Sequence, residues 1–327
     1  MQAFSDLLEQ LYYTAGTKAK AQLILHYLAT TPDPDRGWAI AAMAGTLKFD
    51  FFKRNTVKKL ITERVDPELF AMSYDYVGEV SETVAHLWPE FTPDKALPSL
   101  SEVVDTFANI SKPKVAVTLA NYLTIMTPSQ RWALLKLGTR GLRIGVSARS
   151  IKQILAEYGN KDITEIEKLW HGVAPPYTDL LEWLEGNGSK PDISNAVTFH
   201  PVMLSHPIAQ DDVDDFAPEQ WQIEHKFDGI RVQLVCNTTK EEPEKALFSR
   251  TGDDISHAFP DLLDSVSGNM VLDGELLVMH NQEVDTFNAL QQRLNKKKPT
   301  AALMATNPAG LIVYDALVLD GKQLTDY

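Results

Sequence analysis

The sequence contains one cysteine, Cys236, among 327 residues, so no disulfide can form within the chain. Structural disulfides belong to oxidising compartments and are rare in the cytosol. The cysteine count therefore predicts a cytoplasmic protein. Because a free cysteine is usually a small buried side chain, we expect Cys236 to lie in a core.

Long apolar segments are absent as well. No run of about 18 apolar residues occurs, which excludes a membrane-spanning helix, and residues 1–6 lack the basic start and apolar stretch of a signal peptide. With 44% apolar and 23% charged residues, the composition is that of a soluble globular protein. A chain of 327 residues exceeds one ordinary core, so two domains are expected.

Acidic residues are missing from one part of the chain and concentrated in another. The net charge is −13; residues 211–327 hold 21 acids and 10 bases, whereas residues 1–210 hold 23 acids and 21 bases. The stretch 106–156 contains no acid. Its eight bases, called the basic island below, are Lys112, Lys114, Arg131, Lys136, Arg140, Arg143, Arg149 and Lys152. Such an island fits a face that contacts phosphates, and a solvated surface without acids fits equally well.

Helical periodicity dominates the first 200 residues. Apolar residues recur at the i, i+3, i+4, i+7 spacing of one helix face, beginning with Phe4, Leu7, Leu8 and Leu11. Similar spacing recurs over residues 115–125 and 151–158. The sequence therefore predicts an all-α first domain.

The helical pattern of apolar residues ends, and the composition changes, between residues 186 and 219. Residues 186–191 form turns, and residues 211–215 are an acidic run. We therefore predict a helical domain over residues 1–205 and a second domain over residues 206–327, with a short extended connector at residues 200–204.

After Trp221 the apolar period changes to two. Residues 230–236 alternate, residues 270–278 do so similarly, and residues 311–319 form a mostly apolar run suited to a buried strand. Helices are expected at residues 254–266 and 287–295. The second domain is therefore predicted to be α+β.

The segment 224–231, Glu-His-Lys-Phe-Asp-Gly-Ile-Arg, carries the strongest chemical signal. It places Lys226 in an extended stretch before an Asp-Gly turn, and Glu224 lies two residues away, on the same side of such a stretch. A carboxylate and an amine would then face one pocket. An ordinary hairpin explains the segment equally well, because Asp-Gly is a common turn.

Three further segments follow in order. Arg250 ends one strand, Asp273 and Glu275 share a face of the next, and Tyr314 precedes Asp315 within an apolar strand. Each has an ordinary structural explanation, yet their succession within about 100 residues is hard to dismiss.

This series resembles the covalent nucleotidyltransferases, and among them the ATP-dependent DNA ligases. The lysine motif of the superfamily, Lys-x-Asp-Gly-x-Arg, is matched by Lys226, Asp228, Gly229 and Arg231. The later segments match the family's next motifs, and residues 141–147, Gly-Leu-Arg-Ile-Gly-Val-Ser, are similar to a string in its helical DNA-binding domain. The resemblance implies an all-α DNA-binding domain followed by an α+β nucleotidyltransferase (adenylation) domain that is incomplete at residue 327.

The resemblance also implies an activity: sealing of nicks in duplex DNA through a lysyl-AMP intermediate and an adenylated 5′-phosphate, with ATP and Mg²⁺ as cofactors. Such enzymes serve DNA repair, replication and recombination. It implies a monomer that binds nicked double-stranded DNA and no membrane, and that is associated with the nucleoid if the source is bacterial.

Individual roles follow from the matched motifs. Lys226 is the nucleophile, assisted by Asp228. The adenylate would be bound by Glu224 at the adenine amine, Tyr314 by stacking, Arg231 and Arg250 at ribose and phosphate oxygens, and Glu275 at the ribose or the metal. Duplex phosphates would be contacted by Arg140, Arg143, Ser147, Arg149 and Lys152, and by Arg293, for which a solvated helix end is an alternative.

Alternatives remain open at this point. The family's later motifs, which comprise a second metal-binding glutamate, a pair of lysines and an OB-fold domain, are expected beyond residue 327. An RNA ligase, a capping enzyme or a catalytically inactive nucleic-acid-binding relative would share the lysine motif. The long helical domain with its basic island favours a DNA ligase over an RNA ligase or a capping enzyme. The presence together of Lys226, Asp228, Arg231 and Glu275 argues against an inactive relative.

Overall fold

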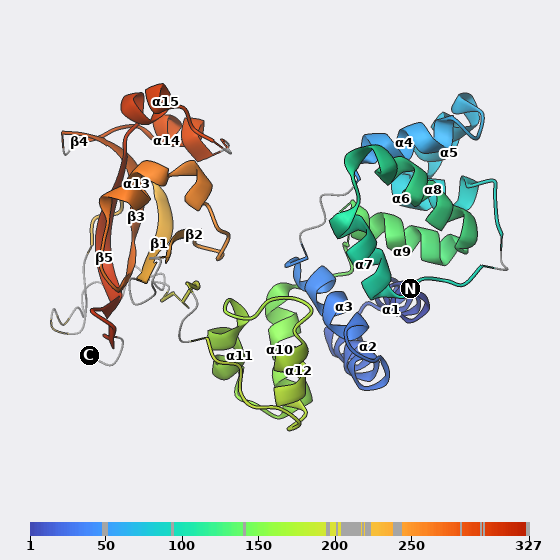
Figure 1. Cartoon of the computed structure of the whole chain (residues 1–327), viewed down its shortest axis with the longest axis horizontal. Coiled ribbons are helices and arrows are strands. Elements are labelled where there is room, and N and C mark those ends of the chain that lie inside the picture. The colour runs from blue at the N-terminus through green and yellow to red at the C-terminus, as the bar shows by residue number, and fades with distance from the viewer. Residues whose placement is uncertain are drawn as a thin grey trace. The chain divides into compact units, whose positions relative to one another are not determined.

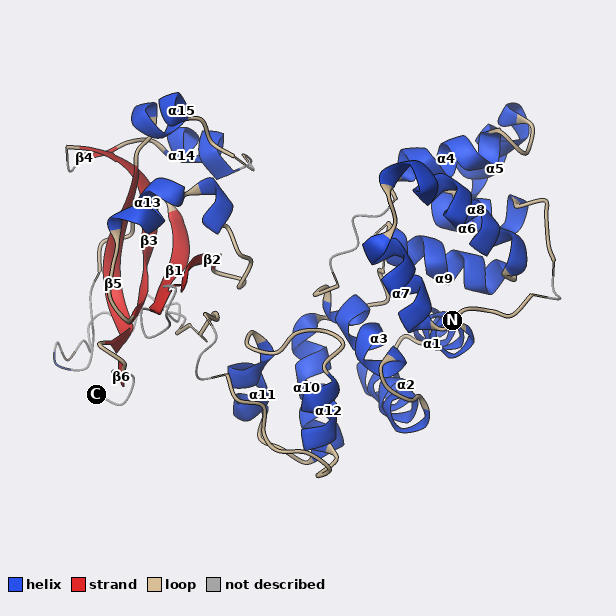
Figure 2. Ribbon diagram, in the orientation of Figure 1, coloured by secondary structure: helices blue, strands red, loops and turns tan. Residues whose placement is uncertain are grey.

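A computed structural model describes residues 1–47, 52–92, 95–139, 142–193, 197–200, 202–203, 217, 219, 224–237, 244–281, 283–294, 296 and 298–324. The chain forms two compact units: residues 1–166 with 173–191, and residues 167–172 with 192–327. We call them the helical unit and the sheet unit, and each is described by itself. Figure 1 labels their elements and Figure 2 separates helices from strands.

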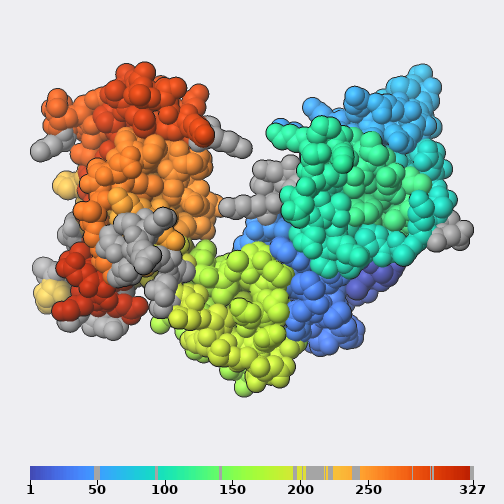
Figure 3. All heavy atoms as spheres, viewed as in Figure 1, coloured from blue at the N-terminus to red at the C-terminus, as the bar shows by residue number. Residues whose placement is uncertain are grey.

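The first part of the chain is helical, as predicted. Its elements are α1 (Gln2–Tyr13), α2 (Thr17–Thr30), α3 (Asp35–Ala44), α4 (Arg54–Thr62), α5 (Pro67–Val77), α6 (Val80–Leu87), α7 (Leu100–Asn109), η1 (Lys112–Lys114), α8 (Val115–Ile125), α9 (Pro128–Gly138), α10 (Ala148–Gly159), α11 (Ile163–Trp170) and α12 (Thr178–Leu184). The apolar face predicted for the first helix, from Phe4 to Leu11, is buried. In the space-filling view, the stretch that includes α7 to α9, in teal and green, covers much of one face of this unit (Figure 3).

Local sequence signals explain where several helices begin. Both α7 and α9 open with a capping box, in which Ser99 pairs with Glu102 and Thr127 with Gln130. These reciprocal bonds satisfy amide groups that have no partner within a helix. No helix in the described part of the chain is long and apolar enough to cross a membrane.

The described strands of the sheet unit form an antiparallel sheet. Its described elements are β1 (Ile230–Asn237), β2 (Glu244–Ser249), η4 (Ser256–Ala258), α13 (Pro260–Ser265), β3 (Met270–His280), β4 (Glu283–Val284), α14 (Phe287–Leu294), α15 (Ala301–Thr306), β5 (Ala309–Leu319) and β6 (Lys322–Gln323). The strand order is β2-β1-β3-β5-β6, and β4 pairs with β3. Both the α+β class and the predicted strands are confirmed, whereas β5 is half-buried rather than buried.

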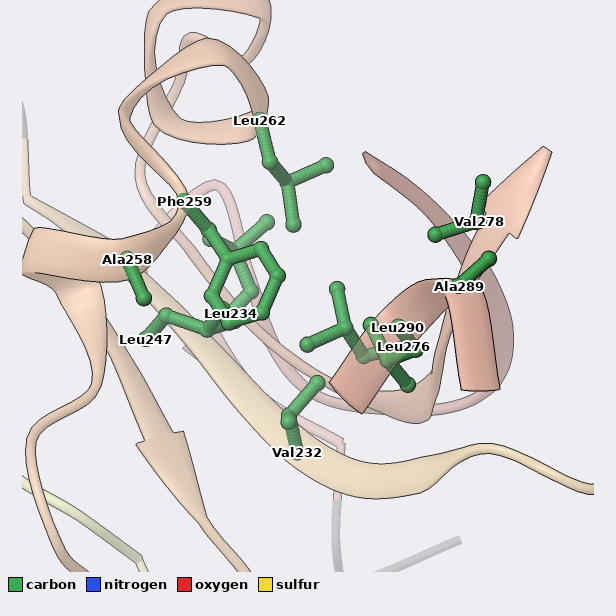
Figure 4. Packing of buried hydrophobic residues seen from close by; sticks show 10 residues of the cluster. All are labelled: Val232, Leu234, Leu247, Ala258, Phe259, Leu262, Leu276, Val278, Ala289 and Leu290. Carbon is green, nitrogen blue, oxygen red and sulfur yellow. The ribbon is translucent and has the colours of Figure 1, made fainter. Parts of the chain in front are cut away.

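One face of this sheet is apolar and packs under helices. Val232 and Leu234 of β1 and Leu276 and Val278 of β3 join Phe259, Leu262 and Leu290 in the main core (Figure 4). Because side chains alternate along a strand, the residues between these positions point to the opposite face. Cys236 is buried, as expected.

The division between the units falls earlier than predicted. Residues 192–203 group with the sheet unit, not with the helices. The fully buried side-chain amide of Gln233 accepts from the His200 amide at 2.6 Å and donates to the His200 carbonyl at 3.2 Å. The Phe199 ring packs edge-on against Phe248 and against His171. These contacts tie the predicted connector to the sheet.

Arg131 organises the middle of the helical unit. Its guanidinium is 3% exposed and donates to the carbonyls of Leu123 and Glu90, each at 2.6 Å. It also reaches the carbonyls of Ala85 and Trp88, each at 3.3 Å. One guanidinium therefore donates to the end of α6, to the chain that follows α6, and to the end of α8.

Replacing this donor should destabilise the helical unit. Arg131→Met removes the hydrogen bonds that Arg131 donates to four carbonyls, and we expect a loss of at least about 4 kcal/mol, since each buried group left without a partner costs roughly 1–3 kcal/mol. Urea unfolding followed by far-ultraviolet circular dichroism measures it. Lys114→Met, which removes an exposed base of the same island, is the matched control; equal stability of the two variants would contradict the assignment.

Candidate functional site

The polar face of the sheet gathers the residues that the motifs single out. Arg231 and Gln233 of β1 lie on the face opposite the helices, and so do Asp273 and Glu275 of β3. The register places Arg231 beside Glu275 and Gln233 beside Asp273. Two motifs that are more than 40 residues apart are therefore adjacent on neighbouring strands.

Arg231 and Asp273 form a nearly buried ion pair. The Arg231 Nε and Nη2 donate to the two carboxylate oxygens of Asp273 at 3.1 and 2.7 Å. The Asp273 side chain is 1% exposed, and that of Arg231 is 23% exposed. These hydrogen bonds raise the pKa of the Arg231 guanidinium above its usual value. The pair leaves the Nη1 end of the guanidinium available for a ligand.

Tyr314 lies on the same face of the sheet. Ile312 pairs with Glu275, and Tyr314 follows it by two residues, so ordinary alternation along β5 turns Tyr314 to the face of Glu275. Because Asp315 pairs with Asp273 and Val313 with Gly274, the register shifts next to Tyr314. The Arg231 guanidinium lies over the Tyr314 ring, 5.5 Å from its centre. Burial, and then the charge of Asp273, raise the pKa of the Tyr314 hydroxyl.

Glu275 is the half-buried carboxyl of the site. Burial raises its pKa, while a hydrogen bond from the Gly229 amide and the charges of Lys226 and Arg231 act in the opposite direction. A Cβ at position 229 would lie 2.5 Å from the Leu276 carbonyl oxygen, so only glycine fits so close to β3. The Asp-Gly turn of the lysine motif thus serves to bring that segment against Glu275.

In the described part of the chain, the lysine segment does not pair with another strand. Residues 224–227 have no regular secondary structure, and in the described residues β1 pairs with β2 and β3. The side chains of Glu224, Lys226 and Asp228 are exposed. Arg250 is exposed in the turn after β2. The charges of Lys226 and Arg231 both act on Glu275, and the exposed position of Lys226 leaves its amine accessible.

A second candidate surface lies in the helical unit. Ser147 caps α10 by accepting from the Ser150 amide at 3.1 Å, as predicted. Arg143 and Arg149 on either side of the cap are exposed, and Lys152 is half-buried. Arg140 lies outside the described residues. Two exposed cations beside a helix N-terminus suit a phosphate.

Other bases of the island have structural roles. Besides Arg131, Lys136 is engaged, since its ammonium lies 3.2 Å from the Glu79 carboxylate. The island is therefore smaller than the sequence suggested, because acids and carbonyls distant in the chain pair with part of it.

Arg293 requires a correction. Its side chain is fully buried, where it donates to both carboxylate oxygens of Asp261 and to the carbonyls of Ala258 and Asn307. This position gives it no access to a DNA phosphate, so both the predicted duplex contact and the solvated helix end are wrong. A single arginine near three lysines carries no sequence signal that separates a surface site from this buried one.

The carboxylates present fit a metal that is held partly by substrate. Among the described residues, no group of three or more His, Cys, Asp or Glu side chains is placed to hold a metal ion. Mg²⁺ commonly binds one or two carboxylates together with the phosphates of a nucleotide. Glu275 and Asp228 are suitable donors, whereas Asp273 is engaged by Arg231.

The chain is similar to several known proteins. Residues 202–327 match the family described as "ATP dependent DNA ligase domain". A "Probable DNA ligase" of Koribacter versatilis is 26% identical over 349 residues, which cover 100% of this chain and 58% of that protein. A "DNA ligase" of Pyrobaculum neutrophilum is 26% identical over 243 residues, 69% of this chain and 40% of that protein. The solved structure "Pmar-Lig_Pre." aligns with 99% of this chain and 57% of its own, at 16% identity and a TM-score of 0.49.

The matched residues 202–327 contain the sheet, the lysine motif and its neighbours, so this part of the chain is similar to the ATP dependent DNA ligase domain. The family match and the relatives named DNA ligase confirm the more specific resemblance, to ATP-dependent DNA ligases. The chain spans a little over half the length of the first of these relatives, 58%.

Two supporting residues were not assigned a role from the sequence. Asp273 was placed on the correct strand face without a partner, and its partner lies 42 positions earlier. Gln233 reads as an ordinary polar position of a strand. Only for Asp273 did a signal exist, since a carboxylate two residues before Glu275 must share its face.

Arg231 and Asp273 should contribute to the stability of the sheet unit mainly through their interaction with each other. Arg231→Met strands a buried carboxylate, so we expect a loss of about 2–4 kcal/mol in the stability of the sheet unit. Asp273→Asn should cost less, and the double variant should be less destabilised than the sum of the two. A double-mutant cycle by urea unfolding measures the coupling; additive losses would show that the two groups do not interact.

Glu275 should make stability depend on pH. Because burial raises its pKa above the unfolded value of about 4.3, the folded state binds this proton more tightly, and stability is lost as pH rises through the folded pKa. Glu275→Gln should therefore raise the melting temperature at pH 7 and leave it nearly unchanged below about pH 4. The exposed Glu283→Gln is the matched control; the same pH trend in both variants would argue against burial at Glu275 as the cause.

Proposed function

We propose that this chain is part of an ATP-dependent DNA ligase that seals nicks in duplex DNA with Lys226 as its nucleophile. The observation that carries the proposal is the match of residues 202–327 to the ligase domain family, together with Lys226 beside the polar face that holds Arg231 and Glu275.

The first step is the transfer of AMP to Lys226. The neutral amine attacks the α-phosphorus of ATP, a nitrogen–phosphorus bond forms, and the bond to pyrophosphate breaks while the amine loses a proton. A lysine suits this step because its ammonium becomes a nucleophile once its proton is removed. The accessible position of Lys226 is what this attack requires.

The polar face would bind the nucleotide. Tyr314 offers a ring on which adenine stacks, and Arg231 already lies over one side of that ring. With two of its donor groups held by Asp273, Arg231 has a fixed direction and presents its Nη1 end to a ribose or phosphate oxygen. Fixed donors lower the reorganisation that the reaction needs.

The remaining roles are assigned by motif. Glu224 would accept from the adenine amine, and Arg250 would contact phosphate. Glu275 would bind the ribose or Mg²⁺, and when bound, this ion would neutralise charge on the phosphates. Asp228 would assist close to Lys226 as AMP passes to the 5′-phosphate of the nick and the 3′-hydroxyl displaces it.

The helical unit would grip the duplex without reading its sequence. Arg143, Ser147 and Arg149 present charge and a helix N-terminus to phosphates, and phosphate contacts position a protein on DNA but carry no sequence information. This suits an enzyme that acts at any nick.

A covalent label tests the catalytic proposal. The protein, incubated with α-labelled ATP and Mg²⁺, should acquire a label that survives denaturing electrophoresis, and Lys226→Ala should abolish it. The exposed lysine of β6, changed as Lys322→Ala, is the control and should retain it. Label on Lys226→Ala would overturn the assignment of the nucleophile. In a separate sealing assay on nicked DNA and RNA duplexes, preferential sealing of RNA would favour the RNA ligase alternative.

The DNA-binding proposal has its own signature. Arg143→Ala should weaken binding to a nicked duplex and reduce the slope of log affinity against log salt by about 0.9, the change expected for one lost phosphate contact. Fluorescence anisotropy over a salt series measures both quantities. An unchanged slope would remove Arg143 from the interface.

A further inference from the structure

The loop that leads into α10 is held by a residue that is far away in the sequence. The Lys20 ammonium, on α2, donates to the carbonyl of Ile144, 124 positions later in the sequence. α2 packs against α10, so this contact lies where the two helices meet. The Ile144 side chain itself is 4% exposed. The loop is thus fixed from its backbone as well as from its side chain.

Gly145 shows that the loop and the lysine fit closely. Its φ is +68°, a conformation that favours glycine. A Cβ added there would lie 2.8 Å from the Lys20 Nζ, so a larger residue would strain the backbone and displace the ammonium. A pocket of about 210 Å³ at this place is lined by Lys20 and Gly145, with Thr17, Lys18 and Ser150 among its other residues.

The anchored loop carries the proposed DNA contacts on both sides. Arg143 directly precedes Ile144, and Ser147, which caps α10, follows three residues after it. A shift at the Ile144 carbonyl therefore moves both the arginine and the cap. Since the Lys20 ammonium already donates to this carbonyl, and a charged donor makes a strong hydrogen bond, its effect on DNA would pass through the loop.

We propose that Lys20 is a positioning residue for DNA binding: it sets the backbone of the loop 142–147 so that Arg143 and the start of α10 face the duplex together. This proposal rests on the proposed function of that surface. It differs from a direct phosphate contact in one measurable respect. A residue that releases no counterion on binding changes the affinity and leaves its salt dependence unaltered.

The experiment compares four variants of the chain on a fluorescein-labelled nicked duplex over a salt series. Lys20→Met should bind about three- to tenfold more weakly, because its effect on DNA binding passes through the loop, with an unchanged salt slope. Lys20→Arg keeps a donor and should recover most of the affinity. Lys18→Met, an exposed lysine on the same helix, controls for the lost charge and should weaken binding less than Lys20→Met. Arg143→Ala should lower the slope by about 0.9.

Each failure has a distinct meaning. If Arg143→Ala weakens binding but Lys20→Met binds no worse than Lys18→Met, the positioning role is wrong and the DNA surface stands. If Lys20→Met lowers the salt slope as Arg143→Ala does, Lys20 contacts phosphate itself and the proposal is overturned. If neither variant changes binding, the proposed DNA surface fails.

A second pair of variants covers a folding defect. Gly145→Ala disturbs the same contact from the loop side. The double variant Lys20→Met/Gly145→Ala should therefore lose less DNA affinity than the sum of the losses in the two single variants. Unfolding of either variant alone would appear in its circular dichroism melt. Additive losses in two folded variants would contradict the coupling of Lys20 to the loop.

Discussion

The polar face of the sheet depends on one ion pair, between Arg231 and Asp273. A carboxylate that is 1% exposed needs a cation at hydrogen-bond distance, and Arg231 on the neighbouring strand supplies it. This requirement ties the lysine motif to the Asp-Gly-Glu motif in register. The same alignment of β1 and β3 allows the Gly229 amide to donate a hydrogen bond to Glu275. Lys226 lies in the segment immediately before β1, and this segment brings it close to Glu275.

Much of this arrangement could be predicted from the sequence, and some could not. Period-two alternation in β1 and β3 correctly placed Asp273 and Glu275 on one face, because side chains alternate along any strand. Tyr314 was assigned by motif alone. The face on which it lies agrees with ordinary alternation from Ile312, whereas the shift in register next to it depends on pairing with β3 and has no signature in local periodicity. The half-buried state of β5 likewise depends on what packs beside it.

Charge patterns were less reliable than apolar patterns for a physical reason. Periodicity is a local property of the chain, whereas the partner of a charge can come from anywhere. Lys136 is paired with Glu79 and Arg131 with carbonyls near α6, all outside the acid-free stretch. Arg293 is likewise paired with Asp261 and so is not available at the surface. A run of bases in a sequence therefore indicates an upper limit for the number of cations that a surface can offer to DNA.

The grouping of residues 167–172 with the sheet unit has a practical consequence for anyone who dissects this chain. The His171 ring lies 5.0 Å from the ring of Phe199, which packs in turn on Phe248 of β2. A fragment that starts at residue 192 would omit His171 and leave one side of the Phe199 ring without this edge-on contact. Limited proteolysis is therefore a poor guide to an autonomous fragment here, since the sheet borrows a segment that precedes its own first strand by more than fifty positions.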